Sequence, residues 1–197
     1  MLGWFKSNHQ ALTAIGAMVV GLAALFVAWD QARVMRAQQH GAVIPVIQID
    51  GFTSRVEDTM SMGLRFMNNG VGPAMIESVR VYRDGQLMTD FEPIMTLLPE
   101  GYDRSWTSIN GRVLAAGAHV EPITLSWPAD DLAGEGLDAL LAEWELWSVN
   151  LCYCSVFDRC WEGGSDDSAR TAIPHCVRPE TDVFDNSGRN DARGAEQ

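Results

Sequence analysis

Lysine is almost missing from this chain of 197 residues, because Lys6 is the only one and the remaining permanent cations are arginines. Lys and Arg together number 14 against 26 Asp and Glu, which gives a net charge of −12. A nucleic-acid interface needs clustered positive charge to meet the phosphates. An acidic domain is also repelled by anionic lipid headgroups. The charge balance therefore argues against nucleic acid as a partner and against adsorption of the domain onto anionic lipid.

Familiar catalytic motifs are also missing. The sequence has no Gly-x-Ser-x-Gly elbow and no His-Glu-x-x-His pattern, and its four histidines are far apart in the chain. Adjacent carboxylates occur at Asp130-Asp131 and Asp166-Asp167, and they are typical of solvated loops rather than of a paired acid and base. No residue set joins a nucleophile to its base, so we expect a protein that is not an enzyme.

One long uncharged stretch is present, Ala11 to Trp29. As a helix, its nineteen residues reach about 28 Å, which matches the hydrocarbon thickness of a bilayer. The run is longer than the apolar region of a typical cleavable signal peptide and continues as AWDQARVMRAQQHG up to Gly41, without a small-residue cleavage site. We therefore expect a short tail over residues 1–10, followed by an uncleaved transmembrane helix with its helical extension over residues 11–40.

The orientation of this span rests on two opposing signals. Lys6 precedes the span and Arg33 and Arg36 follow it, which weakly favours a cytoplasmic domain. Four cysteines within 25 residues favour an oxidising compartment instead. Because the charge difference is small, we expect a protein of the cell inner membrane whose domain is periplasmic, and a cytoplasmic domain stays open.

Beyond the span, short apolar segments alternate with turn residues. Thr59 to Phe66 alternates strictly and predicts a half-buried antiparallel strand. Val43 to Asp50 contains Pro45, which cannot donate to a ladder, so it predicts an edge strand. Other segments predict strands at His119–Trp127 and within Trp144–Trp161, and short helices at Asp90–Leu98 and Gly136–Glu143.

Glycine-rich turns separate these segments. The bend Asn68 to Ala74 leads into a strand that Asp84-Gly85 turns back as a hairpin. Asn110-Gly111 predicts a second hairpin between residues 105–110 and 112–114. The first bend has no lysine and opens a strand rather than a helix, so it does not predict a phosphate site.

Strands of this kind, without a repeat of fixed period, are typical of a mainly β domain. We expect an immunoglobulin-like antiparallel β-sandwich over residues 42–177 and a disordered acidic tail over residues 178–197. At NNGVGPAMIESVRVYRDG and YCSVFDRCW the chain resembles uncharacterised bacterial single-pass membrane-anchored proteins with an immunoglobulin-like β-sandwich domain. The resemblance implies that fold and names no activity.

We expect the four cysteines, Cys152, Cys154, Cys160 and Cys176, to form two disulfides. Cys152 and Cys154 share one face of a predicted strand, so each is expected to bond outward rather than to the other. One arrangement pairs Cys154 with Cys160 and Cys152 with Cys176, and the exchanged pairing is equally allowed by the sequence. Each bridge would stabilise the fold by about 2–4 kcal/mol.

A soft-metal site is the alternative, with Cys152, Cys154, His175 and Cys176 as ligands. Cys-x-Cys is tighter than a structural zinc knuckle and suits Cu(I) thiolates. A span, an immunoglobulin-like domain and a Cys-x-Cys pair are similar to the copper-delivering assembly factor of cytochrome c oxidase. In that family the pair lies in Cys-Phe-Cys-Phe, whereas this chain continues Ser155-Val156-Phe157. Thiol–disulfide oxidoreductases use Cys-x-x-Cys at a helix start, which this pair is not.

The sequence as a whole predicts a membrane-anchored, non-catalytic binding module that belongs to, or is accessory to, an envelope protein complex. Its expected contacts are the lipid bilayer, through Ala11 to Trp29, and another membrane or envelope protein. No metal and no cofactor are expected, and copper is the alternative.

Overall fold

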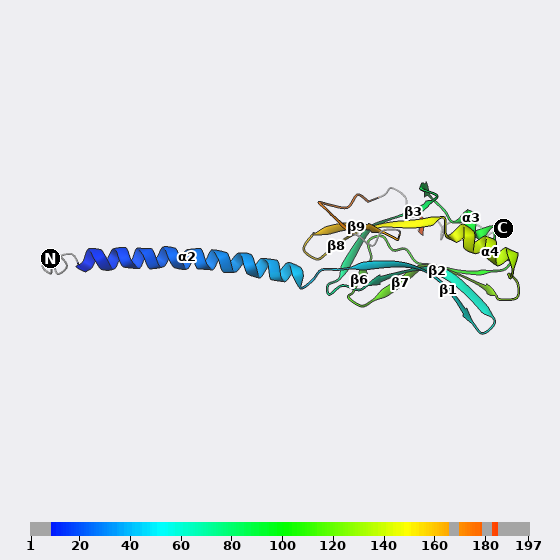
Figure 1. The fold of residues 1–197 in the computed structure, drawn as a ribbon, viewed down its shortest axis with the longest axis horizontal. Coiled ribbons are helices and arrows are strands. Elements are labelled where there is room, and N and C mark those ends of the chain that lie inside the picture. The colour runs from blue at the N-terminus through cyan, green and yellow to red at the C-terminus, as the bar shows by residue number, and fades with distance from the viewer. Residues whose placement is uncertain (1–8, 166–169, 179–182, 185–197) are drawn as a thin grey trace, which may run out of the picture. The chain divides into compact units, whose positions relative to one another are not determined.

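The chain divides into two units, Met1–Ala42 and Val43–Gln197. The computed structural model describes residues 9–165, 170–178 and 183–184 (Figure 1). Residues 1–8 of the expected amino-terminal tail lie outside this part of the chain. His9 and Gln10 belong to the first helix, so the helix begins two residues earlier than the sequence predicted.

The first unit contains α2, a helix of 33 residues from His9 to Gly41. The segment Thr13–Arg36 has a mean hydropathy of 1.8 in its most apolar window, and none of that window is buried within the structure. Phe26, for example, is 76 % exposed. A helix of this length and composition can cross a membrane, as predicted, and it ends at Gly41.

Antiparallel strands form two sheets in the second unit (Figure 1). The first sheet has the order β1-β2-β7-β5, with β1 at Ile47–Val56, β2 at Thr59–Asn68, β7 at His119–Pro128 and β5 at Asp103–Trp106. The second has the order β10-β9-β8-β3-β4, with β10 at Thr171–Ile173, β9 at Cys160–Gly164, β8 at Trp147–Cys154, β3 at Ala74–Arg83 and β4 at Gln86–Met88. The short strand β6, Val113–Leu114, also pairs with β3, and the helices α3 and α4 span Glu92–Met95 and Glu135–Trp144.

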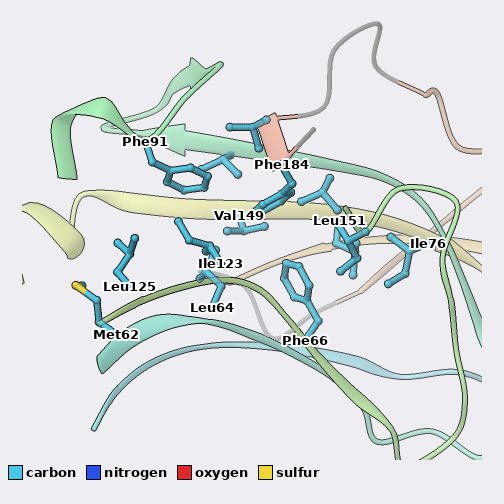
Figure 2. Close-up of a cluster of buried hydrophobic side chains, with 14 of the residues drawn as sticks. Met62, Leu64, Phe66, Ile76, Phe91, Ile123, Leu125, Val149, Leu151 and Phe184 are labelled. Atoms are coloured by element: carbon cyan, nitrogen blue, oxygen red, sulfur yellow. The ribbon is translucent and has the colours of Figure 1, made fainter. Parts of the chain in front are cut away.

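Alternating side chains of both sheets form one hydrophobic core (Figure 2). Met62, Leu64 and Phe66 enter it from β2, as the alternation predicted, and Val149 and Leu151 enter it from β8. A strand directs every second side chain to the same face, so both sheets bury one face against the other. The prediction of a mainly β, antiparallel fold is confirmed.

The bend after β2 is organised by the fully buried side chain of Asn68. Its Oδ1 accepts hydrogen bonds from the backbone N–H groups of Val46 and Gly70, at 3.2 and 3.0 Å. Its Nδ2 donates to the carbonyls of Gly72 and Leu114, at 2.8 and 3.0 Å. One amide therefore joins the entry segment of the domain, the bend and β6, and all its hydrogen-bonding capacity is used.

Two glycines of this bend are required because the entry segment of the domain packs against their backbone. A Cβ atom on Gly70 would collide with the backbone of Ile44 and Val46, and one on Gly72 would collide with Val43. The backbone N–H of Val71 donates to the carbonyl of Ile44 at 3.0 Å. The entry segment thus lies directly on the bend, which only residues without side chains permit.

An ion pair joins α4 to β3. Arg83 donates from Nε and Nη2 to the two carboxylate oxygens of Glu143, at 2.5 and 2.8 Å, and the indole N–H of Trp147 donates to the same carboxylate at 2.9 Å. The hydrogen bond from Arg83 is the main reason that the pKa of Glu143 is lowered, with Trp147 adding to it and burial opposing it.

Two expectations from the sequence are wrong. Asn110-Gly111 does form a turn, but the flanking strands do not pair, because β5 joins β7 in one sheet while β6 joins β3 in the other. Ile109 is fully buried, and the turn docks onto β3 through the N–H of Gly111, which donates to the carbonyl of Ile76 at 2.7 Å.

The expectation of a disordered tail over residues 178–197 is the second, and it is wrong for two residues of that range. Val183 and Phe184 are buried, and the ring of Phe184 lies 5.7 Å from that of Phe91 (Figure 2). Their apolar side chains belong to the core, although the segment around them is polar. The other residues of the expected tail after Arg178 lie outside the described residues.

We expect Asn68→Ala to lower the free energy of unfolding by at least about 2 kcal/mol, because buried backbone groups would lose their partners. Thermal unfolding of the full chain in detergent, followed by near-ultraviolet circular dichroism, measures the change. Asn69→Ala is the matched control, because Asn69 is exposed and its side-chain amide donates to the side chain of Gln48 at the surface. Equal melting temperatures for the two variants would contradict the role given to Asn68.

We expect Glu143→Gln to cost no more than about 1 kcal/mol at pH 7, because Arg83 is partly exposed. The folded pKa of Glu143 is lower than its ordinary value of 4.5, so the pair stabilises fully above that pH and is lost as the pH falls through the folded pKa. Unfolding curves of wild type and variant should therefore converge at acid pH. Glu145→Gln, an exposed neighbour, is the control, and a difference that persists in acid would refute the assignment.

Candidate functional sites: the double disulfide and the β1–β9 cleft

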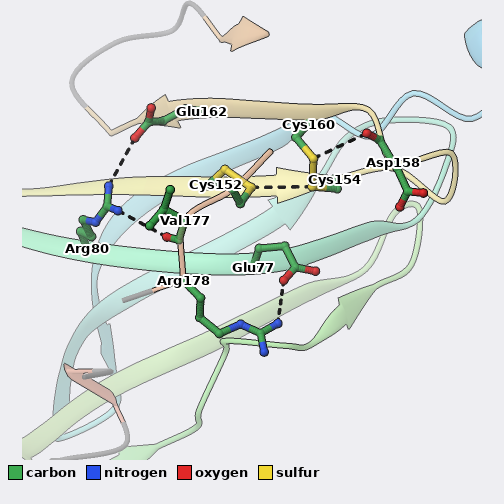
Figure 3. Close-up of a disulfide and its surroundings, with 10 residues drawn as sticks. Glu77, Arg80, Cys152, Cys154, Asp158, Cys160, Glu162, Val177 and Arg178 are labelled. Carbon is green, nitrogen blue, oxygen red and sulfur yellow. Dashed lines mark hydrogen bonds and ion pairs between the residues drawn. A yellow bond between two sulfur atoms is a disulfide. The ribbon is translucent and has the colours of Figure 1, made fainter. Parts of the chain in front are cut away.

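All four cysteines gather at the hairpin of β8 and β9, on the face of the sheet that is turned away from the core (Figure 3). Cys152 is bonded to Cys176 and Cys154 to Cys160, with Cα–Cα distances of 5.7 and 4.0 Å. This is one of the two pairings that the sequence allowed. Cys154 and Cys160 are direct partners in the ladder, so the second bridge crosses neighbouring strands.

The two bridges touch. Sγ of Cys154 lies 3.7 Å from Sγ of Cys176, and the sulfurs of Cys154, Cys160 and Cys176 all lie within 4.8 Å of one another. Cys152, Cys154 and Cys160 are buried, although they point away from the core, because the segment that carries Cys176 crosses over them. Cys176 itself is only partly buried, which makes it the most accessible of the four.

Two arginines hold the segment around Cys176 (Figure 3). Arg80 on β3 donates to the carbonyl of Val177 at 3.4 Å and lies 3.7 Å from the carboxylate of Glu162. Arg178 pairs with Glu77 on β3 at 2.6 Å. These contacts hold the segment on the carboxy-terminal side of Cys176, independently of the sulfurs.

His175, the histidine of the alternative metal set, is exposed and is not part of the sulfur cluster in the described chain. Its place is taken by Cys160. The Cys-x-Cys pair lies within β8 and not at a helix start, where thiol–disulfide oxidoreductases place their reactive pair.

A second feature is a cleft of about 360 Å³ at the edge where β1 faces β9. Leu151 and Tyr153 from β8 line it together with Val46 to Asp50 from the entry segment and β1. Gly163, Gly164, Ser165 and Arg170 complete the lining.

The walls of this cleft are strand edges. β1 pairs only with β2, and β9 pairs with β10 only over Cys160 to Glu162, so Gly163 and Gly164 have no strand partner on that side in the described chain. Arg170 donates to the carbonyl of Pro45 at 3.0 Å and lies over the ring of Trp161, which closes one end. These strand edges offer backbone hydrogen-bonding groups to the cleft.

Sequence reasoning missed this cleft, because strand edges carry no residue signature. The predicted edge strand around Pro45 and the Gly163-Gly164 pair were the available signals. No family model, curated protein or solved structure matches the chain. Function must therefore be argued from these two sites and from the apolar helix.

Proposed function

We propose that this protein is a membrane-anchored, non-catalytic binding module that belongs to, or is accessory to, an envelope protein complex. The observation that carries the proposal is the open cleft between β1 and β9, in a domain joined to a helix that is long and apolar enough to cross a membrane. An extended segment of a partner protein adds to the edge of β1 that has no strand partner in the described chain, and it places apolar side chains against the partly exposed Ile47 and Ile49.

The strand order supports an immunoglobulin-like sandwich. In that fold the strands A, B, E and D form one sheet, and G, F and C form the other. Here β1-β2-β7-β5 corresponds to A-B-E-D, and β9-β8-β3 corresponds to G-F-C, with β4 in the place of a C′ strand. Such domains serve in many binding proteins, and the fold by itself names no partner.

The helix and the disulfides support a place in the cell inner membrane with the domain in the periplasm. The segment Thr13–Arg36 exposes its apolar side chains, which lipid would cover. Two disulfides persist in an oxidising compartment and not in the cytoplasm. The anchor confines encounters to the bilayer surface, so the partner is another membrane or envelope protein.

A non-catalytic role agrees with the residues at the cleft. Gln48, Asp50, Ser165 and Arg170 supply polar side chains to it, and among the described residues no histidine or cysteine lines it. The copper alternative, with Cys152 and Cys154 as ligands, is not favoured for this oxidised form, because both sulfurs are bound to other cysteines.

Site-specific photocrosslinking tests the cleft. A photoreactive phenylalanine analogue at Gln48, an exposed position at the cleft, should give a defined crosslinked band in cells, whereas the same analogue at exposed Ala139 on α4 should not. Gly163→Leu should remove the band, because the new side chain fills the cleft while its Cβ meets only ordinary contacts. A band that Gly163→Leu leaves unchanged would contradict binding in the cleft.

Thiol labelling of spheroplasts tests the compartment. A membrane-impermeant maleimide should add mass only after an impermeant phosphine has reduced the two disulfides. The control is Ser7→Cys in a chain whose four natural cysteines are serines, because that thiol lies on the amino side of the span and should label only after lysis. If the natural cysteines label only after lysis, the domain is cytoplasmic.

A further inference from the structure

The strand ladders hold three of the four cysteine backbones in place without help from the disulfides. Cys152 and Cys154 pair with Ser78 and Met75 on β3 on one side. On the other side, Cys154 pairs with Cys160 on β9. Reduction of the bridges therefore leaves three sulfurs on adjacent positions of one sheet face.

A hydrogen bond and an ion pair position the segment that carries the fourth sulfur, that of Cys176. The carbonyl of Val177, next to Cys176, accepts a hydrogen bond from Arg80, and Arg178 pairs with Glu77 at 2.6 Å. Both contacts are independent of the sulfur chemistry. They therefore favour a position of Cys176 near the other three sulfurs when its disulfide is opened.

The spacing of the sulfurs is that of a metal site. Four thiolates placed tetrahedrally around a cation at about 2.3 Å lie about 3.8 Å apart. Sγ of Cys154 and Sγ of Cys176 are already separated by 3.7 Å, and the sulfurs of Cys154, Cys160 and Cys176 fall within 4.8 Å. The sulfur of Cys152 is not in this group, so rotation about side-chain bonds has to bring it closer while the two bonded pairs move apart.

We propose that reduction converts the double disulfide into a binding site for one thiophilic cation, Cu(I) or Zn²⁺, with Cys152, Cys154, Cys160 and Cys176 as ligands. Each disulfide takes up two electrons and two protons from a dithiol reductant, which leaves as a disulfide. Binding of the cation then releases the thiol protons to water. The oxidised form has no thiolate to offer, so the oxidation state determines whether the site binds metal.

This ligand set differs from the one predicted from the sequence, because Cys160 replaces His175. Cys160 faces Cys154 across the ladder, whereas His175 is exposed outside the cluster. An all-sulfur set selects soft cations. The inference uses neither the cleft nor its partner, so it stands or falls separately from the proposed function.

Metal titration of the reduced full-length protein in detergent tests the inference. The protein is reduced with a phosphine under anaerobic conditions, freed of reductant and titrated with Zn²⁺ or with Cu(I) supplied as its acetonitrile complex. We expect one equivalent to be retained against a chromophoric chelator in at least one arm, and thiolate-to-copper absorption in the Cu(I) arm. Oxidised protein should retain none. The arm with the tighter binding identifies the cation.

Single substitutions assign the ligands. Cys160→Ser should weaken binding by more than about 10-fold, since even residues that only support metal ligands change affinity by that factor. His175→Ala, next to Cys176 in the chain, is the matched control and should bind like wild type. Binding that survives Cys160→Ser and is lost in His175→Ala would overturn the proposed ligand set.

Circular dichroism of the reduced protein before and after metal completes the test. A folded reduced domain that binds one equivalent supports a preorganised site. A reduced domain that is unfolded and refolds with one equivalent supports the same ligands, with folding coupled to binding. Failure of the reduced protein to retain either cation, folded or not, overturns the inference, whatever the crosslinking at Gln48 shows.

Discussion

The β domain depends on one buried amide, the side chain of Asn68. A fully buried amide costs free energy unless its donors and acceptors are paired. Here it bonds Val46, Gly70, Gly72 and Leu114, four backbone groups from three segments. It thereby connects the residues that follow the apolar helix, the end of β2 and the strand β6, which belongs to the other sheet. The two sheets are tied together at this point by hydrogen bonds as well as by the core.

Local sequence patterns predicted individual strands and turns. They failed where the pairing of a strand depends on residues distant in the sequence. The alternation of Met62, Leu64 and Phe66 predicted β2, because the core face of a strand recurs every second residue. Asp84-Gly85 predicted its hairpin, and both residues have positive φ angles. Asn110-Gly111 has the same turn chemistry, yet its flanks join different sheets. Turn chemistry specifies the reversal of the chain and not the strands that pair on either side.

The polar composition of the carboxy-terminal segment led to a wrong prediction of disorder for Val183 and Phe184, for a related reason. Val183 and Phe184 are two apolar residues in a polar segment, too few to produce a pattern. Their burial depends on core contacts that only the folded domain supplies, such as the contact between the rings of Phe184 and Phe91. The cysteine cluster was predictable as a set, since four thiols stand within 25 residues. The cross-strand register of β8 and β9 explains why Cys160 lies with the other sulfurs.

Strand β8 is common to both candidate sites, and its alternation separates them. Leu151 and Tyr153 line the cleft, while Cys152 and Cys154 lie on the opposite face. The same strand is covered on its core side by a cluster that includes Phe184 and on its other side by the segment of Cys176. A bridge or a cation on the cysteine face restrains the backbone that positions Leu151 and Tyr153, because neighbouring residues of a strand share one ladder. Strand β8 therefore carries both candidate sites. Phe184 packs on its core side and Cys176 is bonded to its other side.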